Sequence, residues 1–188
     1  MSNIETIFNF LDNKTCDTIV QYTLSNLSLE IATIYENGKI LNSDVRKSSV
    51  TFNNYENIYP TLIMDILNVI NKNIKIKNCV AVKNINNTSL QFTYYKEGDH
   101  FDWHIDSSET GYTSSRYFSI VIQLNDEFEG GDLIVKNENG QELIIPKSKG
   151  SITIFPSFFW HKVTPVTNGK RYTLVSWYSI EIEKNTLL

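Results

Sequence analysis

Histidine is the residue most suited to bind a metal ion in this chain, which has three of them: His100, His104 and His161. His104-Ile105-Asp106 is an H-x-D triplet, and residues two apart on a β-strand point to the same face. Both side chains can therefore reach one ion. With His161 they would form a set of two imidazoles and one carboxylate. That set occupies one face of an octahedral ion and leaves three positions open, as in non-haem iron(II) oxygenases.

A rival pair lies in the same segment. His100-Phe101-Asp102 is a second H-x-D, and in a regular strand all four ligand-type side chains would share one face. The spacing by itself does not choose between the two pairs. A surface strand with solvated histidines and acids is the simpler interpretation of either triplet.

Two further residues have side chains suited to a dianionic co-substrate that chelates such a metal. Tyr94 lies ten residues before His104, and Arg171 lies ten residues after His161. A guanidinium group is a permanent cation whose paired N–H groups match a carboxylate. A tyrosine hydroxyl can donate another hydrogen bond to it. Taken alone, Tyr94 is more simply a packed strand aromatic and Arg171 a solvated strand residue.

The bulk composition is ordinary for a globular protein of 188 residues, a length that suits one domain with a sizeable core. Hydrophobic residues make up 41%, charged residues 20%, and the formal net charge is −4. No Lys/Arg block supplies the charge that nucleic-acid binders direct at phosphates, so we expect no nucleic-acid partner. Cys16 and Cys79 lack metal-type spacing and are predicted to be reduced thiols.

The distribution of apolar residues predicts where the protein resides. The first residues lack the basic region and apolar core of a signal peptide. No apolar run approaches the roughly 20 residues that span a bilayer. We therefore expect a cytoplasmic protein without membrane association.

The elements that must position these residues follow from apolar spacing. Residues 6–11 suggest a short strand, and Asp12 to Thr15 can cap a helix to about Leu27. That helix has a stripe of Cys16, Ile19, Val20 and Leu24. A second stripe predicts a helix from Tyr59 to Asn73, with Pro60 in its first turn.

From about residue 80 the chain changes to short β-rich runs separated by turn residues. We predict eight strands: Ser89–Tyr95, Phe101–Ile105, Tyr117–Leu124, Asp132–Lys136, Glu142–Ile145, Ser151–Phe155, His161–Val163 and Arg171–Ile180. The fold class is α+β, mainly β: a double-stranded β-helix (jelly-roll) core with N-terminal helices packed on one sheet. Residues 1–188 form a single domain in this prediction. Residues 1–80 are a helical support region, and residues 81–182 are the core that carries the site.

Six motifs occur in a fixed order between about residues 90 and 180. They are Tyr94-Tyr95-Lys96-Glu97-Gly98-Asp99 (Y-x-x-G-x), His104-Ile105-Asp106 (H-x-D), Phe128-Glu129-Gly130-Gly131-Asp132-Leu133 (F-x-G-G-x-L), Gly150 to Ser157 (ending F-P-S), His161 to Val166 (H-x-V-x-P-V), and Arg171-Tyr172-Thr173 through Trp177-Tyr178. In this order they resemble the 2-oxoglutarate/Fe(II) dioxygenases of the prolyl 4-hydroxylase type, and above all the PKHD-type hydroxylases.

The resemblance implies a role for each candidate residue. His104, Asp106 and His161 would bind Fe(II). Arg171 would pair with the 5-carboxylate of 2-oxoglutarate, assisted by Tyr94. His100 and Asp102 would not be ligands, because the interval from Tyr94 fits His104. The implied reaction consumes O2, converts 2-oxoglutarate to succinate and CO2, and hydroxylates an unactivated C–H, with ascorbate in support.

The resemblance also implies a substrate class, namely a prolyl or other amino-acid residue of a protein or peptide. Candidate substrate contacts are Arg46, Tyr112, Arg116 and Trp177, although Trp177 is equally plausible as a core aromatic. The chain would act as a monomer or homodimer. Two alternatives remain: a cupin-like metal-dependent isomerase, which would not need Arg171, and a noncatalytic jelly-roll binding domain.

Overall fold

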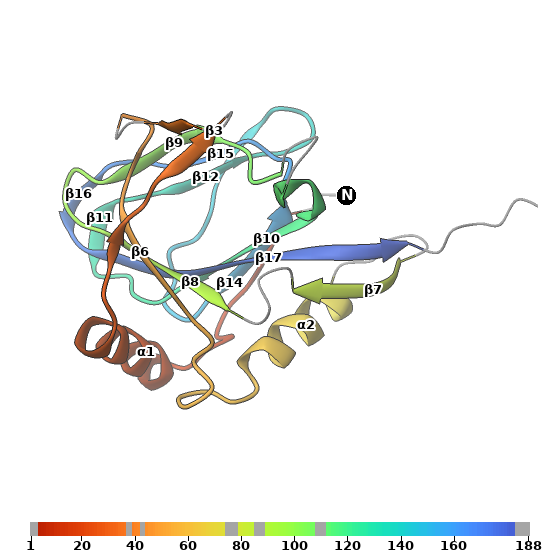
Figure 1. The fold of residues 1–188 in the computed structure, drawn as a ribbon, viewed down its shortest axis with the longest axis horizontal. Helices are drawn as coiled ribbons and strands as arrows, with labels where there is room; N and C mark the ends of the chain where they lie inside the picture. The colour runs from red at the N-terminus through yellow and green to blue at the C-terminus, as the bar shows by residue number, and fades with distance from the viewer. Residues whose placement is uncertain are drawn as a thin grey trace, which may run out of the picture.

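The computed structural model describes residues 4–36, 39–41, 44–73, 79–84, 89–107 and 112–182. Within these ranges two antiparallel sheets form facing layers, and two helices lie on the far side of the larger sheet (Figure 1). The mainly-β architecture predicted from the apolar runs is confirmed. Each of the eight predicted strands is present, with ends that differ from the prediction by at most two residues.

The larger sheet has eight strands in the order β1-β14-β10-β17-β8-β6-β2, with β7 also paired to β17. Its central strand is β17, which pairs with β10 on one side and with β8 and β7 on the other. The strand bounds are β1 (Glu5–Ile7), β2 (Glu30–Ile31), β6 (Ser49–Asn53), β7 (Cys79–Asn84), β8 (Leu90–Tyr95), β10 (Phe118–Gln123), β14 (Ile152–Pro156) and β17 (Arg171–Ile182).

The smaller sheet has five strands in the order β13-β12-β15-β9-β5. Two short antiparallel pairs, β3 with β4 and β11 with β16, complete the described strands. The bounds are β3 (Ile34–Glu36), β4 (Lys39–Leu41), β5 (Arg46–Lys47), β9 (His100–His104), β11 (Phe128–Gly130), β12 (Leu133–Lys136), β13 (Glu142–Ile144), β15 (His161–Val163) and β16 (Val166–Gly169). A 3-10 turn, η1 (Tyr112–Ser115), precedes β10.

Helix α1 (Asn13–Asn26) begins where the sequence predicts, because the Asp12 carboxylate accepts the Thr15 N–H at 2.6 Å. Its buried face is Cys16, Ile19 and Thr23, whereas Leu24, predicted to be on the apolar stripe, is 45% exposed. Thr23 replaces it at the core because its hydroxyl is satisfied by hydrogen bonds to the Ile19 carbonyl and the Tyr55 hydroxyl.

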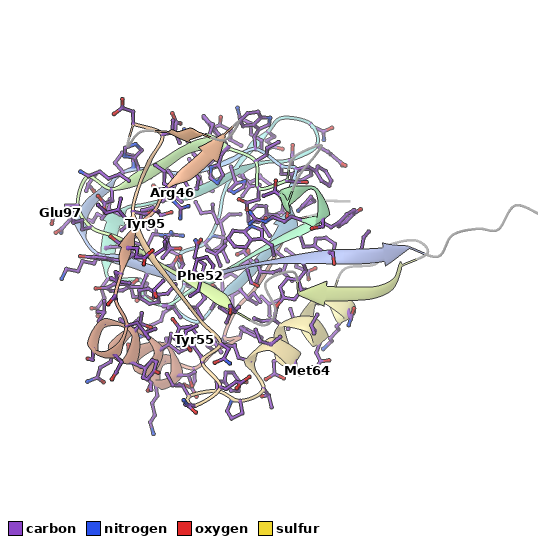
Figure 2. All side chains as sticks on the ribbon, viewed as in Figure 1. Arg46, Phe52, Tyr55, Met64, Tyr95 and Glu97 are labelled. Carbon is purple, nitrogen blue, oxygen red and sulfur yellow. The ribbon has the colours of Figure 1, made fainter. Side chains whose placement is uncertain are left out.

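Helix α2 (Leu62–Asn73) starts three residues later than predicted. The Tyr55 carbonyl accepts the N–H groups of both Ile58 and Tyr59, so the chain makes a separate turn before the helix. Tyr55 itself is buried among the helices and is labelled in Figure 2. Leu62, Ile66 and Ile70 then face inward at helical spacing.

Two separate cores result from the alternation of side chains along the strands of the larger sheet. One face, with Ile120 and Ile122 of β10, packs in a cluster with α1 and α2. The other face points toward the smaller sheet and carries Ser119, Val121 and Gln123 of the same strand. The space between the sheets is therefore partly polar, which prepares it for a ligand.

The prediction of a helical support region over residues 1–80 is corrected by these pairings. Strands β1, β2 and β6 belong to the larger sheet, and β5 forms an edge of the smaller one. The short pair β11–β16 was also missed, because each of its strands is short and ends in turn formers, namely Gly130 in β11 and Asn168 and Gly169 in β16. No helix in the described ranges is long and apolar enough to cross a membrane.

Candidate metal and oxoacid site

Strand pairing brings His104 and His161 together. Strands β9 and β15 are antiparallel neighbours in which His161 lies directly opposite His104, with ring centroids 4.1 Å apart. Asp106 follows the end of β9, with its carboxylate oxygens 3.7 Å from His104 Nε2 and 3.4 Å from His161 Nε2. One ligand atom from each lies within 4.8 Å of the others. Ligands on one face of an octahedral ion are about 3 Å apart for metal–ligand bonds of about 2.1 Å, so a small adjustment completes the site.

A β-bulge resolves the choice between the two H-x-D triplets. His161 pairs with His104 and Val163 with Phe101, so β9 has one more residue than β15 over this interval. The extra residue interrupts the alternation of side chains along β9, so Phe101 and His104, which are three apart, come to the same side. Their rings stack with centroids 3.4 Å apart.

The rival pair has other partners. The ring nitrogens of His100 lie within hydrogen-bonding distance of the Gly98 and Asp44 carbonyls. Asp102 is exposed and accepts the Trp103 N–H at 2.7 Å. Among the described residues, the group that could hold a metal ion is His104, Asp106 and His161, and neither His100 nor Asp102 belongs to it.

Both histidines are held in the tautomer that a metal requires. His104 Nδ1 lies 2.8 Å from the Asp102 carbonyl, and His161 Nδ1 lies 2.8 Å from the Phe159 carbonyl. A carbonyl can only accept, so each Nδ1 carries a proton, which leaves Nε2 of each ring as the nitrogen available to a metal at the shared centre. Burial, together with the neighbouring His161, lowers the pKa of His104 to about 3, which keeps this imidazole neutral near pH 7.

The Asp106 carboxylate is fixed by residues that the sequence analysis did not single out. Its Oδ2 accepts the Ser119 hydroxyl at 2.7 Å, and Ser119 in turn contacts the Ser157 hydroxyl at 2.9 Å. The Asp106 N–H donates to the Ser157 carbonyl at 2.8 Å. Burial by itself would raise the pKa of Asp106, but His161, His104 and the Ser119 hydroxyl together lower it, so the group is an anion. Ser157 lies in the F-P-S motif, which was the only feature of the sequence that could have pointed to these partners of Asp106.

Arg171 lies at the start of β17 and is 3% exposed, at the wall of a small cavity between the sheets. Its Nε has no hydrogen-bond partner among the described residues. Polar and apolar side chains share the lining, which consists of Val121, Gln123, Gly131, Leu133, Ile145, Pro146, Lys147, Ser151, Thr153 and Arg171. A buried guanidinium with an open donor in a cavity fits the carboxylate of a small acid.

The structure corrects the tyrosine assigned to this cavity. Tyr94 lies opposite Tyr172 in the sheet, stacks on its ring at 5.3 Å, and packs in the cluster that faces the helices. Tyr95, the next residue, faces the space between the sheets (Figure 2). It lies opposite Arg171 in the larger sheet, and its ring is 5.4 Å from the Arg171 guanidinium carbon. The neighbour of Arg171 is therefore Tyr95, because adjacent strand residues point to opposite faces.

One strand connects the metal cluster to the cavity. On β10, Ser119 contacts Asp106, whereas Val121 and Gln123 line the cavity beside Arg171. These three residues are two apart, so they share a face and are spaced by about 6.6 Å. The metal cluster and the cavity beside Arg171 therefore lie along the same inner face of β10.

The candidate substrate contacts lie around the metal cluster. The Arg46 guanidinium lies 4.6 Å from the Phe101 ring, which stacks on His104. The Arg116 guanidinium lies 3.9 Å from the Trp177 ring and donates to the Asp106 carbonyl at 3.4 Å. Trp177 is opposite Ser119 in the sheet. Tyr112 begins η1, but its side chain lies outside the described part of the chain.

Comparisons with known proteins agree with this geometry. Residues 90–179 match the 2OG-Fe(II) oxygenase superfamily. A PKHD-type hydroxylase of Rippkaea orientalis is 30% identical over 135 residues, which is 70% of this chain and 56% of that protein. The chain spans about half the length of the curated relatives it matches.

Solved structures show the same fold at low sequence identity. A prolyl-4-hydroxylase of Pseudomonas putida superposes with a TM-score of 0.72 at 18% identity, over 96% of this chain and 94% of that one. A prolyl hydroxylase of Trichoplax adhaerens, in complex with a hypoxia inducible factor peptide fragment, superposes with a TM-score of 0.76 at 17% identity, over 94% and 83%. The predicted jelly-roll fold is thereby confirmed. The ordered motifs lie within the matched residues 90–179, so about half of this chain is similar in sequence to the 2OG-Fe(II) oxygenase superfamily, and the chain shares the fold of the solved prolyl hydroxylases.

Proposed function

We propose that this protein is an Fe(II)- and 2-oxoglutarate-dependent dioxygenase that hydroxylates an unactivated C–H bond. The observation that carries the proposal is the pairing of two preorganised sites. A cluster of two imidazoles and a carboxylate lies at one end of the inner face of β10, and a buried guanidinium with an open donor lies at the other. A cupin-like isomerase would need the first site but has no use for the second.

Each residue of the proposed site would then have a definite role. His104 and His161 would hold Fe(II) through Nε2, and Asp106 would add the third ligand while Ser119 fixes its orientation. Arg171 would pair with the distal carboxylate of 2-oxoglutarate and so orient its oxoacid end toward the metal. The bound iron supplies activation of O2. The overall reaction converts 2-oxoglutarate, O2 and R–H to succinate, CO2 and R–OH.

We further propose that the substrate is a prolyl or other amino-acid residue of a protein or peptide. The Trichoplax prolyl hydroxylase, which shares the fold, was solved with a peptide fragment. Arg46, Arg116 and Trp177 surround the metal cluster and are proposed to contact that substrate, together with Tyr112. Aromatic surface is also available nearby, because Phe158 and Trp160 precede His161 and are half exposed.

The test of the reaction class is the formation of succinate from 2-oxoglutarate with Fe(II), O2 and ascorbate, in the presence of a peptide library screened for +16 mass products. We expect succinate only when Fe(II) is present. Arg171→Gln should lose most 2-oxoglutarate binding while retaining metal binding. Absence of both turnover and 2-oxoglutarate binding in the unaltered protein would refute the proposal.

A further inference from the structure

The turn between β11 and β12 forms the wall of the cavity beside Arg171. Gly131 has φ +58°, and a Cβ added there would lie 3.2 Å from Arg171 Cδ, so the turn packs directly against the arginine stem. Asp132 follows and is tied in place by Thr164, whose hydroxyl accepts the Asp132 N–H at 2.8 Å and whose own N–H donates to the Asp132 carbonyl at 3.0 Å. A carboxylate is therefore held close to the proposed oxoacid cavity.

A second cation, Lys147, lines the same cavity. Its ammonium group lies 2.8 Å from Asp132 Oδ1 and donates to the Gly130 carbonyl at 2.5 Å. The side chains are 29% and 32% exposed, so water screens this ion pair only in part. The ammonium is thus already bound to the turn.

The charge of Asp132 acts on Arg171. Burial lowers the pKa of Arg171, and electrostatic interactions with Tyr95 and Asp132 oppose that shift. An uncompensated carboxylate at this place would compete with a bound acid for the guanidinium and would also repel that acid. Lys147 is placed to cancel the charge.

We propose that Lys147 is a positioning residue for the co-substrate: its ammonium neutralises Asp132, so that the Arg171 guanidinium is left to pair with the distal carboxylate of 2-oxoglutarate. This inference rests on the proposed function. In this proposal the Gly130–Asp132 turn and Lys147 together set the charge next to Arg171, in addition to forming the wall of the cavity.

The experiment measures 2-oxoglutarate affinity by calorimetry on the full chain loaded with Mn(II), without O2. We expect Lys147→Met to weaken binding about tenfold, because the Asp132 charge is left unpaired. Adding Asp132→Asn to that variant should restore affinity to within about threefold of the unaltered protein. Lys147→Arg, which retains the charge, should bind normally. Thermal unfolding checks that each variant is folded.

The outcomes separate the possible failures. Normal affinity in Lys147→Met overturns the proposal. A double variant that stays as weak as Lys147→Met also overturns it, because Lys147 would then contact the ligand itself. If the unaltered protein binds Mn(II) but not 2-oxoglutarate, the proposed function is overturned as well.

Discussion

The hydroxyl of Ser119 offers the sharpest test of how the chain prepares its metal site. It donates at 2.7 Å to Oδ2 of Asp106, a carboxylate whose side chain is 12% exposed. In the variant Ser119→Ala, Asp106 loses this donor and is freer to rotate away from the position set by the histidines. We expect the fold to persist, because Asp106 also remains anchored through its backbone N–H to the Ser157 carbonyl.

The magnitude follows from the kind of hydrogen bond that is lost. A hydrogen bond to a charged group contributes about 1.5–3 kcal/mol, and each 1.4 kcal/mol corresponds to about tenfold in affinity. Metal affinity should therefore fall roughly 10- to 100-fold, the usual range when a hydrogen-bond partner of a metal ligand is replaced.

The assay is an anaerobic calorimetric titration of the metal-free protein with Fe(II), repeated with Mn(II). Ser157→Ala is the matched control, because it removes a hydroxyl that contacts Ser119 but leaves the bond from Ser119 to Asp106. It should change affinity by less than about threefold. Unchanged metal affinity in a folded Ser119→Ala protein would refute the reasoning, as would an equal loss in both variants.

Three further predictions follow from particular contacts. Tyr94→Phe should leave 2-oxoglutarate affinity unchanged in a binding titration, since this ring faces the helices; a marked loss would restore it to the site. Burial raises the pKa of Tyr55 from 10.0 to about 12, so the folded state holds this proton longer than the unfolded state does. The contribution of Tyr55 to stability should then be fully present below pH 10 and fall by about 3 kcal/mol in total as the pH rises through 12, and denaturant melts should show a shallower decline in Tyr55→Phe. Gly150→Ala should lower the melting temperature by many degrees, because its Cβ would lie 2.0 Å from the Leu11 carbonyl oxygen at φ +76°; a melt that matches the unaltered protein would contradict this.

The metal ligands illustrate how far sequence reasoning could go. Period-two alternation showed that His104 and Asp106 can share a face, but it gave the same result for His100 and Asp102. The bulge in β9 breaks that tie, and it arises only when β9 pairs with β15. No local pattern of β9 alone could place the extra residue.

The choice between Tyr94 and Tyr95 has a related cause. Strand β8 is covered by the helices on one face and by the smaller sheet on the other, so nearly all its residues are buried. A strand with one solvated face reveals its inner side by alternation of polar and apolar residues, whereas β8 has no such contrast. Pairing with β17 sets which tyrosine lies beside Arg171.

The sequence by itself determined what is local or ordered along the chain: the eight core strands, the capped helix after Asp12, the six motifs and the identity of the metal-ligand types. Tertiary structure alone decided which side chains meet. It placed His161 opposite His104, gave Asp106 its Ser119 donor, and put Lys147 on Asp132 beside Arg171. The physical reason is that alternation fixes which residues share a face, while only strand pairing and the layers that cover each sheet fix which face is inside.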